Sequence, residues 1–105
     1  MFVRNVSMNV KPNSIEEFSK SFNTVILPLL RKQPGFCEAF AYVNETATHI
    51  TGISMWESKE QADAYHSAGY PEVLKSLASV IDGTPKVRTS SVSNSTIQAA
   101  VPAAA

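Results

Sequence analysis

The sequence has one cysteine, four glycines and no long apolar stretch among its 105 residues. A single cysteine cannot form a disulfide within the chain, which is typical of proteins that fold in a reducing compartment. No apolar segment reaches the roughly 18 to 20 residues that a membrane-spanning helix requires. The N-terminus also lacks the basic and apolar regions of a signal peptide. These absences predict a cytoplasmic protein without a membrane partner.

Charge is scarce and evenly divided. Nine Lys and Arg residues balance nine Asp and Glu residues, and neither sign forms a run. A nucleic-acid partner is therefore not expected, since such proteins carry a basic patch. Metal and phosphate motifs (HExxH, CxxC, Walker, GxGxxG) are missing as well. Two histidines cannot supply a three-His zinc site, so no metal site is predicted.

What the sequence does contain is strict alternation at its start. Residues 2–10 place apolar side chains at every second position, which is the period of a β-strand. One face carries Phe2, Arg4, Val6, Met8 and Val10, and the other carries Val3, Asn5, Ser7 and Asn9. Long cationic side chains usually keep their charged ends in water, so Arg4 and Arg88 are expected at faces or edges that water reaches.

Helical spacing follows the first strand. Ser14 and Glu17 form a Ser-x-x-Glu capping box. Apolar residues then recur every three or four positions, which predicts an amphipathic helix over 15–33. Pro28 falls inside this helix and is expected to kink it or to tighten its last turns.

Three strands and a broken second helix continue the pattern. The further predicted elements are strands over 36–43, 49–56 and 86–92, a helix over 59–67, and a helix from Pro71 to Ile81. The turn-like sequence NETAT joins the first two of these strands into a hairpin. Ser58 with Gln61 forms a second capping box at the start of the second helical region.

The order strand, helix, strand, strand, helix, strand determines the predicted fold class. Right-handed crossovers and adjacent hairpin strands turn this βαββαβ order into a ferredoxin-like α+β sandwich. Both helices then lie on one face of a four-stranded antiparallel sheet. Residues 1–92 form this domain, and the Ala- and Ser-rich tail over 93–105 is expected to be a flexible end.

The face without helices is expected to need a cover. An antiparallel sheet can leave one face to water, yet both faces of the strands over 36–43 and 49–56 carry apolar bulk. Small domains often bury such surface by pairing. We therefore predict a homodimer in which the two sheets pack face to face.

Several stretches resemble a known family. They are FVRNVSMNVKP at the start, ILPLLRKQPGF at the end of the first helix, the hairpin, and MWESKEQADAY at its exit. Together they are similar to the antibiotic biosynthesis monooxygenase domain family, over residues 1–92. The resemblance implies a ferredoxin-like domain that pairs into a dimeric α+β barrel. The wider superfamily includes cofactor-free monooxygenases of aromatic polyketides or quinols, haem-degrading enzymes and domains of unassigned role.

The resemblance implies catalytic roles for Asn5, Tyr65 and His66. In the haem-degrading branch a first-strand Asn hydrogen-bonds the activated oxygen, and Asn5 falls at the matching place. Tyr65 falls where that branch carries a catalytic Trp. A phenol and an amide can hold a substrate anion, and an imidazole can take its proton. The three are predicted to meet in one pocket, although a cross-strand neighbour or water would also satisfy the Asn5 amide.

Ser7, Tyr42 and Trp56 are the predicted substrate-binding residues. The flat ring of Trp56 would either stack on a flat aromatic ligand or close the end of the core. Ser7 shares the face of Asn5 and would either join the pocket or point to solvent.

Haem is the alternative to a cofactor-free site. The haem-ligating His of the haem-degrading branch falls at Lys75, and a protonated Lys is not a suitable haem ligand. His66 would replace it only if the helix were shifted, because one helical step turns a side chain by about 100°. The predicted cofactor is therefore none.

The resemblance implies a cofactor-free monooxygenase that oxidises a small phenol or quinol with O₂, each subunit binding one planar aromatic ligand. The first alternative is a non-catalytic dimeric binding or stress-response module whose cavity is mainly packing. The second is a haem-binding or haem-degrading protein. Fold does not determine function, so the resemblance serves as an analogy.

Overall fold

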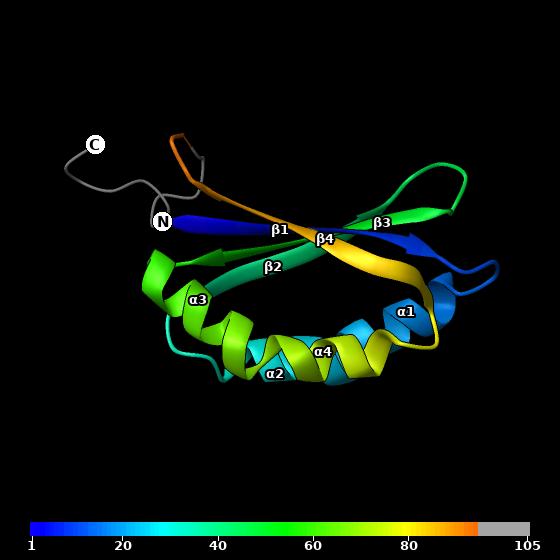
Figure 1. Ribbon diagram of the computed structural model, residues 1–105, viewed down its shortest axis with the longest axis horizontal. Helices are drawn as coiled ribbons and strands as arrows, with labels where there is room; N and C mark the ends of the chain where they lie inside the picture. Colours follow the sequence, from blue (N-terminus) through cyan, green and yellow to red (C-terminus); the bar gives the residue numbers. More distant parts are fainter. Residues whose placement is uncertain (95–105) are drawn as a thin grey trace.

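The computed structural model describes residues 1–94, which form a sheet with helices on one of its faces (Figure 1). The elements are β1 (Phe2–Val10), α1 (Ile15–Ser21), η1 (Phe22–Ile26), α2 (Leu27–Arg31), β2 (Phe36–Val43), β3 (His49–Trp56), α3 (Lys59–Ala68), α4 (Tyr70–Leu77) and β4 (Ile81–Ser91). The strands form one antiparallel sheet in the order β2-β3-β1-β4. This arrangement confirms the predicted ferredoxin-like α+β fold. Most of the predicted tail, residues 95–105, lies outside the described part.

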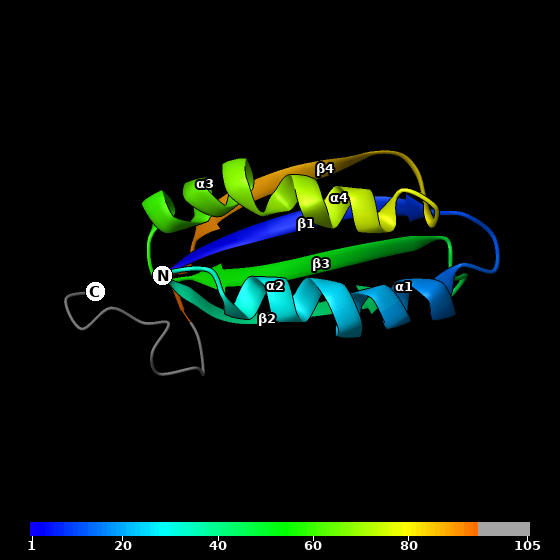
Figure 2. The same ribbon diagram turned by 90° about the horizontal axis from the view of Figure 1, so that it is seen from below.

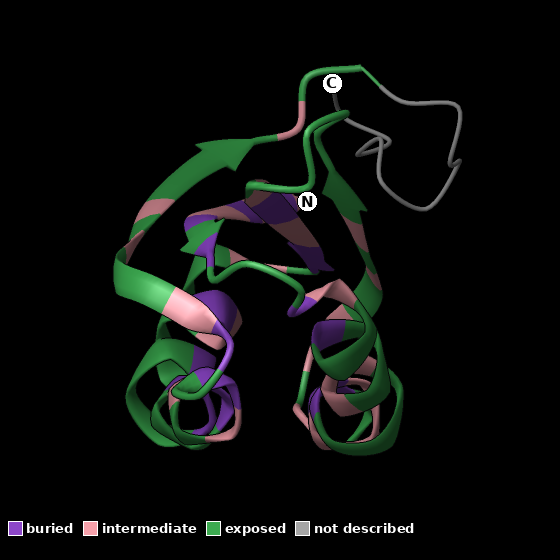
Figure 3. Ribbon diagram, turned by 90° about the vertical axis from the view of Figure 1, so that its right-hand side faces the viewer, coloured by how far each residue is buried: buried purple, intermediate pink, exposed green. Residues whose placement is uncertain are grey.

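The helices form two arms that cross the sheet side by side (Figure 2). The arm of α1, η1 and α2 lies under β2 and β3, and the arm of α3 and α4 lies under β1 and β4. Buried residues concentrate between these arms and the sheet (Figure 3). None of the helices within residues 1–94 is long and apolar enough to cross a membrane.

The first helical arm contains a widened turn before Pro28. Residues Phe22–Ile26 form a π-helix, in which the Leu27 N–H bonds to the carbonyl of Phe22. Proline has no N–H and its ring crowds the carbonyl four residues earlier, so a wider turn relieves the conflict. The predicted tightening is found after Pro28, where the N–H groups of Lys32 and Gln33 bond to carbonyls three residues earlier. The widened turn before the proline was not predicted.

The second arm ends earlier than predicted. Helix α4 stops at Leu77, and Ile81 already pairs with Val10 as the first residue of β4. Val80, expected on the helical stripe, is fully buried in the turn between them. Its carbonyl accepts a hydrogen bond from the Lys11 N–H. Pairing with β1 therefore overrides the helical spacing of this segment.

The two capping boxes behave differently. The Ser58 hydroxyl accepts a hydrogen bond from the Gln61 N–H at 3.2 Å, which confirms the cap of α3. Ser14 makes no such bond, because its hydroxyl turns back to the carbonyl of Pro12. The predicted Ser14 capping box is therefore wrong. The backbone at Ser14 is not extended (φ −108°, ψ 4°), whereas a capping residue normally is.

Strand parity in β1 decides which side chains enter the core. Its helix-facing side contributes Phe2, Arg4, Val6, Met8 and Val10. Arg4 is 2% exposed, so the expectation that it reaches water is wrong. Arg88 is exposed, as expected. Arg4 is buried because the β period fixes its direction, whatever its charge.

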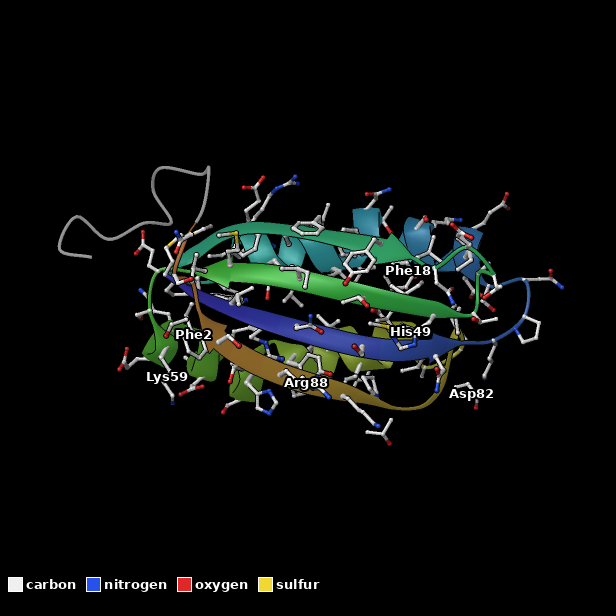
Figure 4. The ribbon with its side chains drawn as sticks, turned by 90° about the horizontal axis from the view of Figure 1, so that it is seen from above. Phe2, Phe18, His49, Lys59, Asp82 and Arg88 are labelled. Atoms are coloured by element: carbon white, nitrogen blue, oxygen red, sulfur yellow. The ribbon has the colours of Figure 1, made fainter. Side chains whose placement is uncertain are left out.

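The opposite face of the sheet carries no helix (Figure 4). Asn5 pairs there with Ile53 on β3 and with Arg88 on β4. The rings of Phe40 and Tyr42, on the edge strand β2, are 51% and 56% exposed. These exposed rings are the apolar bulk that the strand pattern predicted for this face, and the polar side chains of β1 lie on the same face.

Candidate functional site

A buried cation lies at the centre of the candidate site. Within residues 1–94, Arg4 is the only charged residue that is buried. Its position in β1 directs it into the apolar layer between the sheet and the helices. Charged side chains are seldom buried there unless partners compensate for the water they lose. The surroundings of Arg4 therefore form the candidate site.

Three rings of the second helical arm surround the guanidinium. Its central carbon lies 5.2 Å from the ring centroid of Tyr65 and 4.8 Å from that of Tyr70, within the range of cation–π attraction. Its Nη1 lies 2.9 Å from Nδ1 of His66, and the His66 ring stacks on Tyr70. Arginine can only donate, so Nδ1 accepts, and the proton of the neutral ring is on Nε2.

Arg4 nevertheless has hydrogen-bonding capacity to spare. Its Nε and Nη2 are buried, and neither bonds to any acceptor of the described chain. The two ion pairs within residues 1–94 are Lys59–Asp63 and Lys75–Glu72, so no carboxylate pairs with the guanidinium. Burial lowers the pKa of Arg4, but a guanidinium keeps its proton at neutral pH. The result is a buried cation with two nitrogen donors unused.

Arg4 lines a half-enclosed cavity of about 60 Å³ between the two helical arms and the sheet. Its apolar walls come from both arms and include Phe22, Ile26, Val73 and Leu77. A cavity of about 150 Å³ is known to hold benzene. A planar ring therefore has to project from the open side or displace side chains.

Gly52 leaves part of this cavity open. It lies on β3 opposite Val6 and lines the cavity. A Cβ added at Gly52 would meet no other atom within 4 Å. The missing side chain therefore contributes directly to the space that a ligand would occupy.

Tyr65 is held in place from several sides. Its ring stacks on Trp56 at 4.9 Å and lies beside Arg4. A Cβ added at Gly69 would come within 2.8 Å of the Tyr65 ring, which shows how closely the start of α4 approaches it. Burial raises the pKa of Tyr65 to about 12, and the charge of Arg4 opposes this only in part. At neutral pH Tyr65 is therefore a neutral hydrogen-bond donor rather than a base.

The structure brings Tyr65 and His66 together around Arg4 but separates them from Asn5. Asn5 lies on the helix-free face, where its Oδ1 accepts a 3.4 Å hydrogen bond from the Ser7 hydroxyl. The prediction that Asn5 and Tyr65 meet in one pocket is therefore wrong for a single subunit. Successive residues of a strand point to opposite faces, so Arg4 takes the position that Asn5 was expected to fill.

The other two predicted ligand contacts also lie away from the cavity. Tyr42 projects from the helix-free face with more than half of its surface exposed. Trp56 has no exposed surface, and its Nε1 donates to the Ser54 hydroxyl at 2.9 Å. It supports Tyr65 from behind, which is the core role considered as its alternative.

Sequence reasoning missed Arg4, Gly52 and Tyr70 as residues of the site. A signal for Arg4 was present, because one charge stood in an otherwise apolar face of the first strand. Gly52 gave a weaker signal as an isolated glycine inside a strand. Within residues 1–94, no group of three or more His, Cys, Asp or Glu side chains is arranged to hold a metal ion.

Comparisons with known proteins agree with this architecture. The sequence model of the family described as antibiotic biosynthesis monooxygenase matches residues 1–75. A monooxygenase of Streptomyces coelicolor from the gene ActVA-Orf6, in complex with nanaomycin D, has a TM-score of 0.77 at 21% identity, covering 91% of this chain and 90% of that one. SnoaB, a cofactor-independent oxygenase from Streptomyces nogalater, has a TM-score of 0.74 at 13% identity, covering 91% and 96%.

A protein of unknown function from Nitrosomonas europaea is similar to the same degree, with a TM-score of 0.74 at 14% identity, covering 91% of this chain and 92% of that one. At such identities the structural likeness shows the fold alone. A comparison with curated protein sequences finds no significant match.

Replacing Arg4 by Met should increase the free energy of unfolding by about 1–3 kcal/mol, because the unpaired buried charge costs more than an apolar chain of similar length. Urea denaturation would measure the change. The exposed Arg31 on α2 provides the matched control, and Arg31→Met should give no gain. A clear loss of stability in Arg4→Met would instead identify the cation as a net stabiliser.

Part of the loss of stability in alkali should come from Tyr65. Its pKa rises from 10 to about 12 on folding. The contribution of the neutral Tyr65 side chain to the free energy of unfolding is therefore complete below pH 10 and is lost as the pH approaches 12. Between about pH 9 and pH 11 the free energy of unfolding should fall about 1 kcal/mol further in the parent than in Tyr65→Phe. Urea titrations at both pH values would measure this, with Tyr42→Phe as the exposed control. Equal pH dependence in the parent and Tyr65→Phe would contradict the assignment.

Proposed function

The chain belongs to the antibiotic biosynthesis monooxygenase family, and on that premise we propose that it oxidises a small planar phenol or quinol with O₂ and without a bound cofactor. The observation that carries this proposal is the half-open apolar cavity with a buried, partly unpartnered Arg4 and two tyrosine rings at its wall. Support also comes from the two solved relatives described above as a monooxygenase and a cofactor-independent oxygenase.

The substrate supplies the electrons in such a reaction. A phenol with a free ring C–H loses its O–H proton, and the resulting anion forms a C–O bond to O₂. The peroxide takes up a proton. Its O–O bond then breaks as the ring C–H proton leaves, which yields a quinone and one water. Stabilisation of the substrate anion is the part of this sequence that a protein group can promote.

Arg4 and Tyr65 are the groups that we assign to this task. A buried guanidinium acts more strongly on an anion than an exposed one, because water does not screen it. Tyr65, whose hydroxyl is neutral at neutral pH, lines the same cavity. His66 fixes one nitrogen of Arg4, and that bond occupies the lone pair with which the ring would otherwise take a proton.

A non-catalytic binding module is the second candidate function. The specific observation in its favour is the size of the cavity, about 60 Å³, which is below the volume known to hold a benzene ring. In that case the same surfaces would bind part of a ligand without oxidising it.

Oxygen consumption with a panel of naphthols and hydroquinones should separate the two functions. The parent should consume O₂ with at least one of them. Gly52→Leu should reduce this rate about tenfold or more, because the added side chain fills the cavity and leaves the substrate no room. Gly52→Ala is the matched control and should keep most of the activity, since its Cβ meets no atom within 4 Å.

Two results would contradict the enzyme proposal. Ligand binding without O₂ consumption across the panel would favour the binding module. An unchanged rate in Gly52→Leu would mean that the reaction takes place elsewhere on the protein.

We also propose that the protein is a homodimer through the helix-free face. Exposed Phe40 and Tyr42 offer the apolar surface for this contact, and Asn5 and Ser7 would then face the partner sheet instead of the cavity. The likeness to a family in which such pairing is usual supports it.

Light scattering on a sizing column should give twice the mass of the chain. Changing Phe40 and Tyr42 together to Glu should convert the protein to a monomer, because buried unpaired charges oppose association. Val25→Glu is the control, since Val25 is exposed on η1 in a helical arm. A monomeric parent, or a double variant that remains dimeric, would contradict this interface.

A further inference from the structure

We propose that the cavity takes its ligand already deprotonated, with a carboxylate, phenolate or enolate oxygen held by Nε and Nη2 of Arg4. This inference rests on the proposed function to the extent that it names the charge of the ligand in the same cavity. It can be tested separately, because binding of an anion does not require turnover.

Two buried nitrogen donors of Arg4 are unused. Arg4 is 2% exposed and lines the cavity, and its Nε and Nη2 have no acceptor within residues 1–94. Neighbouring N–H groups of a guanidinium form a fork that matches the two oxygens of a carboxylate. Since buried donors normally have partners, a ligand oxygen that displaces the side chains covering these two nitrogens would complete the site.

Within residues 1–94, no carboxylate pairs with these two nitrogens. Asp63 is the carboxylate whose charge reaches Arg4, and it does so only through space. Its side chain is 55% exposed and is already paired with Lys59 at 2.7 Å. An anionic ligand would therefore supply the charge compensation that no carboxylate within residues 1–94 gives to Arg4.

The lining of the cavity contains no side chain that would remove a proton from the ligand. The polar residues of its lining are Arg4, Ser54, Tyr65 and Tyr70, and none of them is a carboxylate or an imidazole. His66 lies behind the guanidinium with its accepting nitrogen already used. The ligand therefore leaves its proton in water before it enters the cavity, and the guanidinium selects the anion.

Benzoate and benzamide form a suitable pair of probes, since they differ in charge but hardly in shape. Titration of isotope-labelled protein should shift the Arg4 Nε–H resonance with benzoate. Benzoate should bind the parent about tenfold to a hundredfold more tightly than benzamide, the usual range for a hydrogen bond to a charged group. Arg4→Met should abolish this preference and leave the affinity for benzamide within about twofold.

Two further variants control for structure. Arg88→Met removes an arginine from the opposite face of the sheet and should behave as the parent. Arg4→Lys keeps the charge but loses the fork, so it should retain only part of the preference. Because its charge is conserved, it tests the inference even if Arg4→Met folds poorly.

Equal affinity of the parent for the two probes would overturn the inference, as would a preference that survives in Arg4→Met. An Arg4 Nε–H resonance that does not move in a large excess of benzoate would also overturn it and would indicate a merely hydrated guanidinium. These results would remove the role assigned to Arg4, whereas oxygen consumption that is lost in Gly52→Leu would still support the enzyme proposal. Conversely, failure of oxygen consumption with the anion preference intact would remove the enzyme proposal alone.

Discussion

A positive charge held inside an apolar layer is the constraint on which the site depends. The β period of the first strand directs Arg4 away from water and towards the helices. Two tyrosine rings and one histidine nitrogen hold it there without neutralising it. The same face of the strand packs the core, so the charge cannot be turned outwards without reversing the whole strand.

The rest of the fold creates a space beside this charge. The helical arms contact each other directly where α4 meets α1 and η1, and apolar side chains of both arms line the space beside the sheet. Phe22 and Ile26, at the two ends of the widened turn before Pro28, are among these side chains. The backbone adjustment that a proline imposes therefore also sets where part of the cavity wall lies.

Much of the fold follows from the sequence, because periodicity and turn residues are local signals. The strands over 36–43 and 49–56 have the limits that alternation predicted, and the cap at Ser58 is formed. The errors in the predicted elements arise where contacts between residues distant in the sequence determine the local structure. Pairing with β1 draws Ile81 into a strand, although its spacing was helical.

The site was less predictable for the same reason. The sequence shows that Arg4 and Asn5 lie on opposite faces, but not which face the helices cover. A general preference of arginine for water and an analogy for Asn5 both pointed to the wrong face. Gly52 acts through space that it leaves empty, which no residue pattern reveals. Tyr65 lies on the predicted helix and lines the cavity, since its helix position depended only on local spacing, and its role stays a prediction.

The close approach of Gly69 to the Tyr65 ring has a consequence for motion. That ring lies between the indole of Trp56, the guanidinium of Arg4 and the backbone where α3 meets α4. Because protein interiors are close-packed, a half-turn of this ring requires its neighbours to move apart. Rotation of Tyr65 therefore requires the junction of the two helices to move outwards, and the frequency of ring flips becomes a measure of how often the wall of the cavity opens.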